Sequence, residues 1–235
     1  MENINLILAW LVHIFTASGL IVGLYSIISI INGDYSLLLK LTVIGLIIDG
    51  TDGTMARKLK VKKLIPEIDG NLLDNITDYI NYTFIPVIFF YLGEFIGEEY
   101  KAIICIGILL SSAYQFSRTD AKTNDNYFRG FPSLWNLFII LNIIFKIEQI
   151  TNLITISICI ILSFIPIKFI YPSKTKELRK ITIPITIISC LIFVVSIFSE
   201  PSETTLKIAK TVVIIYFAYL TLASIYLTYR TRNRW

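Results

Sequence analysis

Long runs of apolar residues recur along almost the whole chain, and short polar segments interrupt them. A bilayer core requires about 20 apolar residues per helix, within a range of about 17–25. On that measure the pattern predicts eight membrane-spanning helices with short connections, most of which contain glycine, proline or charged residues. The predicted helices cover residues 6–31, 36–57, 71–92, 101–118, 131–147, 150–170, 181–199 and 205–229.

The composition favours a membrane protein over a soluble one. Apolar residues make up 55% of the 235 residues and charged residues only 16%, whereas soluble domains contain about 25% charged residues. A surface that faces lipid instead of water produces this deficit. We therefore predict a single all-α, polytopic membrane domain over residues 1–235. Its core helices lie within about 6–147, and additional helices lie within about 150–229.

The basic residues gather on one side of the predicted membrane. With eight helices, both termini and the loops after the second, fourth and sixth helices share one side, and 16 of the 21 basic residues fall there. Basic loops stay in the cytoplasm, so we expect both termini to be cytoplasmic. This distribution assigns the net charge of +4 to topology and lipid headgroups, and we expect no nucleic-acid partner. The other five basic residues are Lys40, Lys101, Lys146, Lys207 and Lys210.

Four aspartates lie where the second and third predicted helices meet the cytoplasmic side. Asp49 and Asp52 are three residues apart, and Asp74 and Asp78 are four apart. Each pair therefore lies on one face of its helix. A short basic hairpin joins the helices, so the four carboxylates can converge. Carboxylates at membrane depth require a compensating partner, and a hard divalent cation such as Mg²⁺ or Mn²⁺, shared with a substrate phosphate, would supply it.

Small residues are interleaved with these acids. Gly53, Ala56 and Gly70 remove side-chain bulk beside the carboxylates, so a large ligand could approach the backbone closely. A set of acids solvated at the interface is the alternative. It suits a single aspartate better than four aspartates interleaved with three small residues.

These residues resemble the signature of the CDP-alcohol phosphatidyltransferases, D-x-x-D-G-x-x-A-R…G-x-x-x-D-x-x-x-D. Members of this family are integral membrane enzymes that exchange the CMP of a CDP-linked lipid or alcohol for a second alcohol. Twelve residues separate the arginine from the second glycine, a longer spacer than most members have. The eight matching positions are Asp49, Asp52, Gly53, Ala56, Arg57, Gly70, Asp74 and Asp78.

The longer spacer, with Pro66–Gly70, resembles the phosphatidylcholine synthase branch of this family, and so does the segment 113–136. Eight helices also suit that branch. The resemblance covers most of residues 10–140, and beyond about 150 only the hydropathy matches. It implies transfer of the phosphatidyl group of CDP-diacylglycerol to choline, which yields phosphatidylcholine and CMP. The implied location is a bacterial inner (cytoplasmic) membrane, with the active site at the cytoplasmic face.

The resemblance also implies roles for the motif residues. Asp49, Asp52 and Asp74 would hold one or two metal ions, Mn²⁺ or Mg²⁺, against the diphosphate. Asp78 would accept the hydroxyl proton of the incoming alcohol as general base and would help to hold the second metal ion. The nucleotide would bind at Gly53, Ala56, Arg57 and Gly70.

Further candidates concern the lipid phosphate and the acceptor. Arg118 and Lys122, after the fourth predicted helix, are candidates to bind the lipid phosphate. A quaternary ammonium has no N–H donor and binds to aromatic faces. The candidates for choline binding are Tyr79, Tyr82, Tyr114, Tyr127 and Trp135.

Other functions and assemblies stay open. Serine or inositol could be the acceptor, and Arg129 could bind the carboxylate of serine. A cation transporter fits less well, because the acids crowd one end of the membrane and a transport path would place them near the midplane. Gly19 and Gly23 form a G-x-x-x-G pair that permits close helix packing, within the chain or across a homodimer. For His13 we expect a hydrogen bond between helices.

Overall fold

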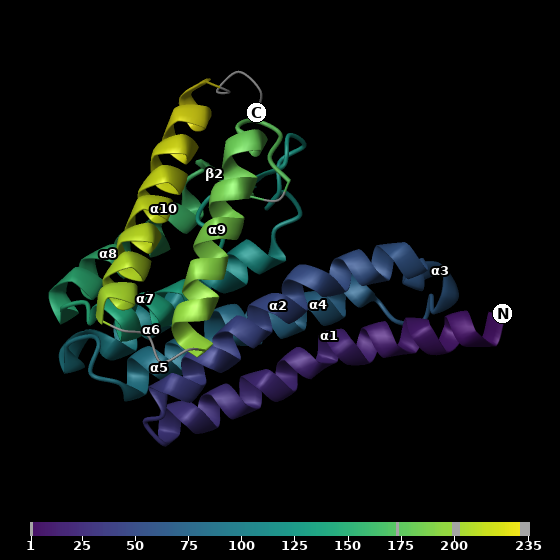
Figure 1. The fold of residues 1–235 in the computed structure, drawn as a ribbon, viewed down its shortest axis with the longest axis horizontal. Helices are drawn as coiled ribbons and strands as arrows, with labels where there is room; N and C mark the ends of the chain where they lie inside the picture. Colours follow the sequence, from purple (N-terminus) through teal and green to yellow (C-terminus); the bar gives the residue numbers. More distant parts are fainter. Residues whose placement is uncertain (1, 173, 199–202, 231–235) are drawn as a thin grey trace. The chain divides into compact units, whose positions relative to one another are not determined.

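The computed structural model describes residues 2–172, 174–198 and 203–230. The described chain is almost entirely helical, with one π-helical turn (η1) and one two-stranded antiparallel ribbon (Figure 1). Each of the eight apolar stretches contains helix. The elements are α1 (Glu2–Ile31), α2 (Tyr35–Leu59), α3 (Val61–Leu64), α4 (Gly70–Tyr79), η1 (Ile80–Phe84), α5 (Ile85–Leu92), α6 (Glu98–Ser117), β1 (Tyr127–Arg129), α7 (Asn136–Phe145), α8 (Gln149–Phe164), β2 (Lys168–Ile170), α9 (Arg179–Phe198) and α10 (Glu203–Arg230).

Three of the described helices are long and apolar enough to cross a membrane. They comprise Ile4–Ile31, Glu98–Ser117 and Lys207–Arg230. Helices α7 and α8 are apolar but have only 10 and 16 residues. The all-α class and the presence of candidate membrane helices are thus confirmed. The number of crossings and the side of the termini stay predictions.

The predicted limits of the fifth and sixth helices are wrong. Helix α7 begins only at Asn136, because Pro132 and the left-handed backbone of Ser133, with φ of 55°, interrupt the apolar run before it. Helix α8 ends at Phe164, because Pro166 has no backbone N–H and disfavours helix at the residue before it. Residues 168–170 then form β2 and pair with β1, so a short two-stranded ribbon interrupts the otherwise helical chain.

The described chain forms two compact units. The first unit contains residues 1–94 and 135–143, and the second contains residues 95–134 and 144–235. All eight positions of the aspartate motif belong to the first unit.

Helices α1 and α2 run side by side after a tight turn at Gly33 (Figure 1). The Asp34 carboxylate caps α2 by accepting the Leu37 N–H at 2.9 Å. Helix α1 also packs against α4 at Gly19, where an added Cβ would lie 2.6 Å from Cγ2 of Thr77. At Gly23 an added Cβ would lie 3.3 Å from Cγ2 of Ile80. The glycine pair therefore permits close packing within the chain.

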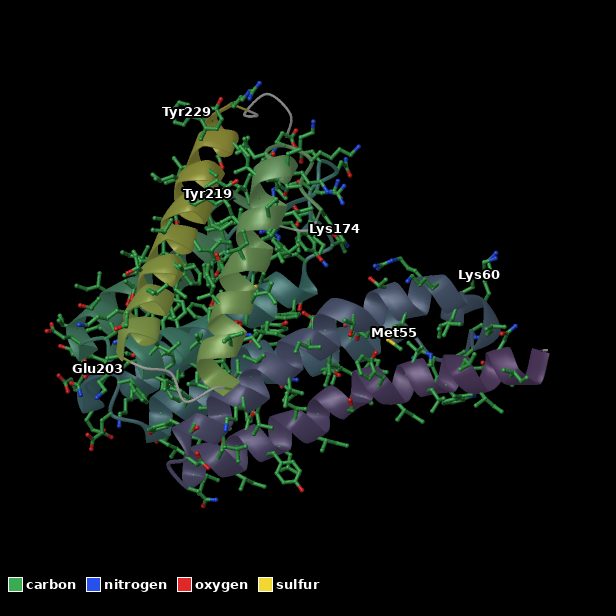
Figure 2. The ribbon with its side chains drawn as sticks, viewed as in Figure 1. Met55, Lys60, Lys174, Glu203, Tyr219 and Tyr229 are labelled. Atoms are coloured by element: carbon green, nitrogen blue, oxygen red, sulfur yellow. The ribbon has the colours of Figure 1, made fainter. Side chains whose placement is uncertain are left out.

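A short connection returns the chain from α2 to α4. Helix α2 ends where Lys60 adopts a left-handed conformation, and α3 follows as a single turn (Figure 2 labels Lys60 there and Met55 earlier on α2). Val61 and Ile65 then pack against Ala9 and Val12 of α1. This apolar contact anchors the basic hairpin beside the first helix.

The third long helical segment contains a widened turn. The Ile85 N–H bonds to the Ile80 carbonyl, five residues earlier, which defines η1. Pro86 explains this turn, because it lacks an N–H and its ring would clash with the Tyr82 carbonyl in a regular α-helix. Asn81 and Tyr82 therefore belong to a π-helical turn instead of a regular helical face.

The second unit is built around the ribbon of β1 and β2. Lys168 is fully buried there, with its Nζ 2.7 Å from Oδ2 of Asp125 and 5.3 Å from the ring centre of Tyr127. Helices α9 and α10 meet where Tyr219, labelled in Figure 2, hydrogen-bonds to Thr182 at 2.6 Å. The Lys168 N–H donates to Oγ1 of Thr228 at 3.1 Å, which joins α10 to the ribbon.

Candidate active site

Three of the four predicted aspartates come together in the first unit. Asp49 of α2 and Asp74 and Asp78 of α4 each offer one carboxylate oxygen, and these oxygens lie within 4.8 Å of one another. Asp69 starts α4 in the required place, because its Oδ1 accepts the N–H groups of Asn71 at 3.0 Å and Leu72 at 3.2 Å. The capped start fixes the helical phase that turns Asp74 and Asp78 toward α2.

The fourth aspartate lies in the same cavity but outside this group of three. Asp52 is 5% exposed, and its Oδ1 accepts the N–H of the adjacent Gly53. One turn of α2 separates it from Asp49, so both acids of α2 line the cavity. The four carboxylates thus share one cavity, as the helical spacing predicts.

This cavity, which we call the acid cavity, lies between α1, α2, α4 and η1. About 240 Å³ of its space is not filled by atoms, and part of that space is open to the surroundings. No lysine or arginine is among the described residues that line it. Those residues are Gly19, Gly45, Ile48, Asp49, Asp52, Asp74, Thr77, Asp78, Asn81 and Tyr82.

Tyr82 and Asn81 organise one wall of the acid cavity. The Tyr82 hydroxyl donates a hydrogen bond to Oδ2 of Asp49. The Asn81 amide donates to the carbonyls of Gly19 at 3.1 Å and Thr77 at 2.9 Å. The sequence pattern indicated Tyr82 as a candidate for choline binding, but it indicated neither the bond from Tyr82 to Asp49 nor the role of Asn81. A polar residue within an apolar helix was the available signal for Asn81.

The donor set of the acid cavity fits a hard divalent cation. Carboxylates at this separation repel one another, and the described residues that line the cavity include no lysine or arginine. Oxygen donors without nitrogen or sulfur ligands are those that Mg²⁺ and Mn²⁺ prefer. Asp49, Asp74 and Asp78 are therefore the residues best placed to hold a metal ion.

The residues predicted to bind the nucleotide belong to α2 and α4, the helices that carry the aspartates. On α2, the Arg57 guanidinium donates to Oγ1 of Thr54 at 3.0 Å and lies 3.2 Å from where a Cβ on Gly53 would be. At the start of α4, a Cβ on Gly70 would lie 3.3 Å from Cε1 of His13. Side chains at these glycines would thus crowd neighbours already in place.

His13 itself is nearly buried on α1. It is 8% exposed, and its Nε2 has no hydrogen-bond partner among the described residues. The hydrogen bond between helices that we expected is not found at this nitrogen. His13 instead contributes its ring to the contact with Gly70.

The match to a known family covers these elements. The profile of the CDP-alcohol phosphatidyltransferases matches residues 9–165, more than half of the chain. The chain belongs to the CDP-alcohol phosphatidyltransferase family. The matched region includes most of α1 and all of α2 and α4, and α2 and α4 carry the whole aspartate motif.

Several curated members of this family are similar over most of their length. A protein of Borreliella burgdorferi is 91% identical over 234 residues, which cover all of both chains. A protein of Legionella pneumophila is 42% identical over 73% of this chain and 68% of its own length. A protein of Pseudomonas aeruginosa is 32% identical over 86% of this chain and 85% of its own length. All three are named phosphatidylcholine synthase.

The two cations that the family resemblance suggested for the lipid phosphate lie in the second unit. The Nε of Arg118 is 2.7 Å from Oδ1 of Asp120, and Arg129 pairs with the same carboxylate. Hydrogen bonding to Arg118, and to a lesser degree to Arg129, holds the pKa of Asp120 well below its usual range, against the opposing effect of desolvation. Lys122 lies over aromatic rings, with its Nζ 5.9 Å from the centre of Phe128. The phosphate role of Arg118 and Lys122 stays a prediction.

The aromatic residues predicted for choline fall in different places. Only Tyr82 among them lines the acid cavity. Tyr79 is half-buried on α4, and Trp135 is fully buried in the first unit, 5.6 Å between ring centres from Phe138. Tyr114 and Tyr127 belong to the second unit. There the Arg118 guanidinium lies 5.1 Å from the Tyr114 ring centre, and Lys168 occupies the face of Tyr127.

Proposed function

We propose that this family member transfers the phosphatidyl group of CDP-diacylglycerol to choline and releases CMP. The observation that carries the proposal is the 91% identity, over the whole of both chains, to a protein named phosphatidylcholine synthase. The clustered carboxylates of Asp49, Asp74 and Asp78 support a metal-dependent phosphoryl-transfer site in the same chain.

The aspartates divide the work of the proposed reaction. Asp49, Asp52 and Asp74 would hold Mg²⁺ or Mn²⁺ against the diphosphate, with Asp78 contributing to a second ion. The bound ion would polarise the phosphoryl oxygens and stabilise the leaving CMP. Tyr82 orients the Asp49 carboxylate through its hydroxyl, so the ligand geometry is held before the substrate binds.

Asp78 is the proposed general base. The choline hydroxyl oxygen forms a new bond to the phosphorus that carries diacylglycerol, and the bond from that phosphorus to the oxygen of CMP breaks. The hydroxyl proton passes to the Asp78 carboxylate as the attack proceeds. The nucleotide would bind along Gly53, Ala56, Arg57 and Gly70, and Arg118 and Lys122 would contact the lipid phosphate.

We also propose the membrane placement. The chain would cross a bacterial inner membrane eight times, with both termini and the aspartate motif at the cytoplasmic face. The gathering of 16 of 21 basic residues on one predicted side supports this orientation.

The decisive experiment supplies purified protein with CDP-diacylglycerol and labelled choline, serine or inositol in parallel, and measures CMP release. We expect CMP and labelled phosphatidylcholine with choline only. Release with serine would assign the other acceptor. No CMP release with any alcohol, together with ion flux in liposomes, would overturn the proposed enzyme in favour of a transporter.

Metal removal tests the proposed ligand set. Because the acid cavity contains no basic side chain among its described residues, we expect EDTA to abolish CMP release and added Mn²⁺ or Mg²⁺ to restore it. Asp49→Asn and Asp74→Asn should each raise the metal concentration required for half-maximal rate. Full turnover in metal-free buffer would contradict the ligand assignment.

A further inference from the structure

A second cavity adjoins the acid cavity within the first unit. The two cavities share Gly45, Asn81 and Tyr82 as a common wall. About 260 Å³ of the second cavity is not filled by atoms, and part of that space is open to the surroundings. The remaining lining comes from four helices: Ser26 of α1, Thr42 and Leu46 of α2, Ile85 of α5 and Asn136 of α7.

Most polar side chains that line this second cavity already donate their hydrogen bonds to other groups. The Ser26 hydroxyl donates to the Val22 carbonyl at 2.9 Å, and the Thr42 hydroxyl donates to the Leu38 carbonyl at 2.8 Å. The Asn81 amide nitrogen donates to two backbone carbonyls. These residues therefore have only oxygen lone pairs to offer to a ligand.

Asn136 contributes the group that most clearly requires a ligand. Asn136 is 3% exposed, and its Oδ1 has no hydrogen-bond partner among the described residues. Burying an amide oxygen without a partner is costly. Asn142, on the same helix and 1% exposed, provides the contrast, because its amide donates to the Phe138 carbonyl at 2.8 Å.

We infer that the second cavity is the subsite for the ammonium end of the acceptor alcohol, with Asn136 as its specificity-determining residue. This inference rests on the proposed function and extends it. A trimethylammonium group has no N–H donor and is stabilised by oxygen lone pairs and an aromatic face. The cavity offers the oxygens of Asn81 and Asn136, and Tyr82 belongs to its wall.

The shared wall also gives the acceptor an orientation. With its ammonium end beyond Tyr82, the acceptor's hydroxyl end points to the acid cavity and to Asp78. The described residues that line the second cavity include no lysine or arginine, so a serine carboxylate there would have no cation to pair with, and the subsite favours choline over that acceptor. The enclosed free space is only about that of one water molecule, so side chains of the lining must move apart for a trimethylammonium group to bind.

The test compares two leucine variants of the full-length purified protein. We expect Asn136→Leu to raise the choline KM by about tenfold, the loss expected for a cation contact of moderate strength. Its KM for CDP-diacylglycerol should stay near that of the unmodified chain. Asn142→Leu is the matched control, because it removes a buried amide from the same helix without touching either cavity, and its choline KM should not change. Equal choline KM values in both variants would overturn the subsite.

A second variant and a binding measurement keep the test decisive. A Cβ on Gly45 would make ordinary contacts, 3.8 Å from Oδ1 of Asn81 and 3.9 Å from Cγ1 of Val22. Gly45→Ala should therefore fold. Its added methyl group should reduce the space beside the shared wall and so raise the choline KM. Equilibrium binding of labelled choline, without CDP-diacylglycerol, separates this inference from the proposed function. Binding that Asn136→Leu loses and Asn142→Leu keeps supports the subsite even where no CMP is released, and binding that Asn136→Leu keeps contradicts it.

Discussion

Tyr82 belongs to both cavities of the first unit. Its hydroxyl donates to Asp49, and only 6% of the residue is exposed. A tyrosine in this place has two separable parts, because the hydroxyl positions a metal ligand and the ring offers an aromatic face to a cation. Replacing only one of these parts can therefore distinguish the two roles.

Tyr82→Phe and Tyr82→Ala should have different kinetic effects. The phenylalanine keeps the ring and loses the hydrogen bond to Asp49. A hydrogen bond to a charged group contributes about 1.5–3 kcal/mol, so we expect kcat to fall by at least about tenfold with little change in the choline KM. The alanine loses the ring as well, and its choline KM should rise, because a cation–π contact contributes about 0.5–2 kcal/mol. Equal choline KM values for the two variants would argue against a role of the ring.

Asp78→Asn separates proton transfer from metal binding. The amide cannot accept the proton, so we expect transfer to choline to slow by at least about a hundredfold. Binding of CDP-diacylglycerol with metal should persist, because Asp49, Asp52 and Asp74 remain. Single-turnover CMP release and equilibrium binding of the nucleotide lipid measure the two effects.

Asp69→Asn is the matched control for that substitution. Asparagine caps a helix about as well as aspartate, so this variant should keep its rate. Normal turnover by Asp78→Asn would place the base elsewhere, with His13 or Glu67 next in line. Loss of lipid binding would instead make Asp78 chiefly a metal ligand.

At the scale of elements, the acid cavity depends on how closely α1 approaches α4. The contact at Gly19 leaves no room for a side chain, and the Asn81 amide bonds to the Gly19 carbonyl in the same region. The π-helical turn that Pro86 imposes carries Asn81 and Tyr82. A close helix contact and a widened turn therefore position the same wall.

Gly19→Ala should destabilise the first unit, because its Cβ would lie 2.6 Å from Cγ2 of Thr77. Overpacking of this kind costs about 1–3 kcal/mol. Gly50→Ala is the control, because no atom lies within 4 Å of its added Cβ and alanine favours helix by about 0.5–1 kcal/mol over glycine. Thermal unfolding in detergent should show a lower Tm for Gly19→Ala than for the parent protein. The Tm of Gly50→Ala should not decrease. A Gly19→Ala protein as stable as the parent would mean that α1 and α4 pack less closely.

At the scale of the whole molecule, the distribution of basic residues predicts the membrane topology. The positions Ser173 and Ser202, which flank the seventh predicted helix, lie outside the described residues. Their exposed neighbours Lys174 and Glu203 are described and labelled in Figure 2. Lys174 and Glu203 therefore report on opposite ends of the seventh predicted helix.

Cysteine labelling at these positions tests the eight predicted crossings. In a background without Cys105, Cys159 and Cys190, we expect Lys174→Cys to react only from the cytoplasmic side and Glu203→Cys only from outside. Lys62→Cys, in the basic hairpin, should react like Lys174→Cys. If Lys174→Cys and Glu203→Cys were labelled from the same side, the seventh predicted helix would not cross the membrane and the predicted number of crossings would be wrong. The assignment of the acid cavity would survive, because it depends only on the first unit.

The hydropathy and the helical period of the sequence were sufficient to predict where the helices lie and which helix faces carry the aspartates. Each apolar stretch contains helix, and the spacing of Asp49, Asp52, Asp74 and Asp78 placed each pair on one face, because the period of a helix is a local property. The motif also identified the family. These features depend on neighbouring residues and not on packing between distant segments.

Only the tertiary structure decided how the site is assembled. The bond from Tyr82 to Asp49 and the contact of Gly19 with Thr77 join residues that are far apart in the sequence. The placement of Asn136 beside Ser26 and Thr42 in the second cavity does so too. The predicted start of α7 and the predicted end of α8 were also wrong. Hydropathy measures only how apolar a residue is and does not show that Pro132 and Pro166 restrict the backbone there. Which side chains share a cavity depends on helix separation and rotation, and these are set by packing across the whole first unit.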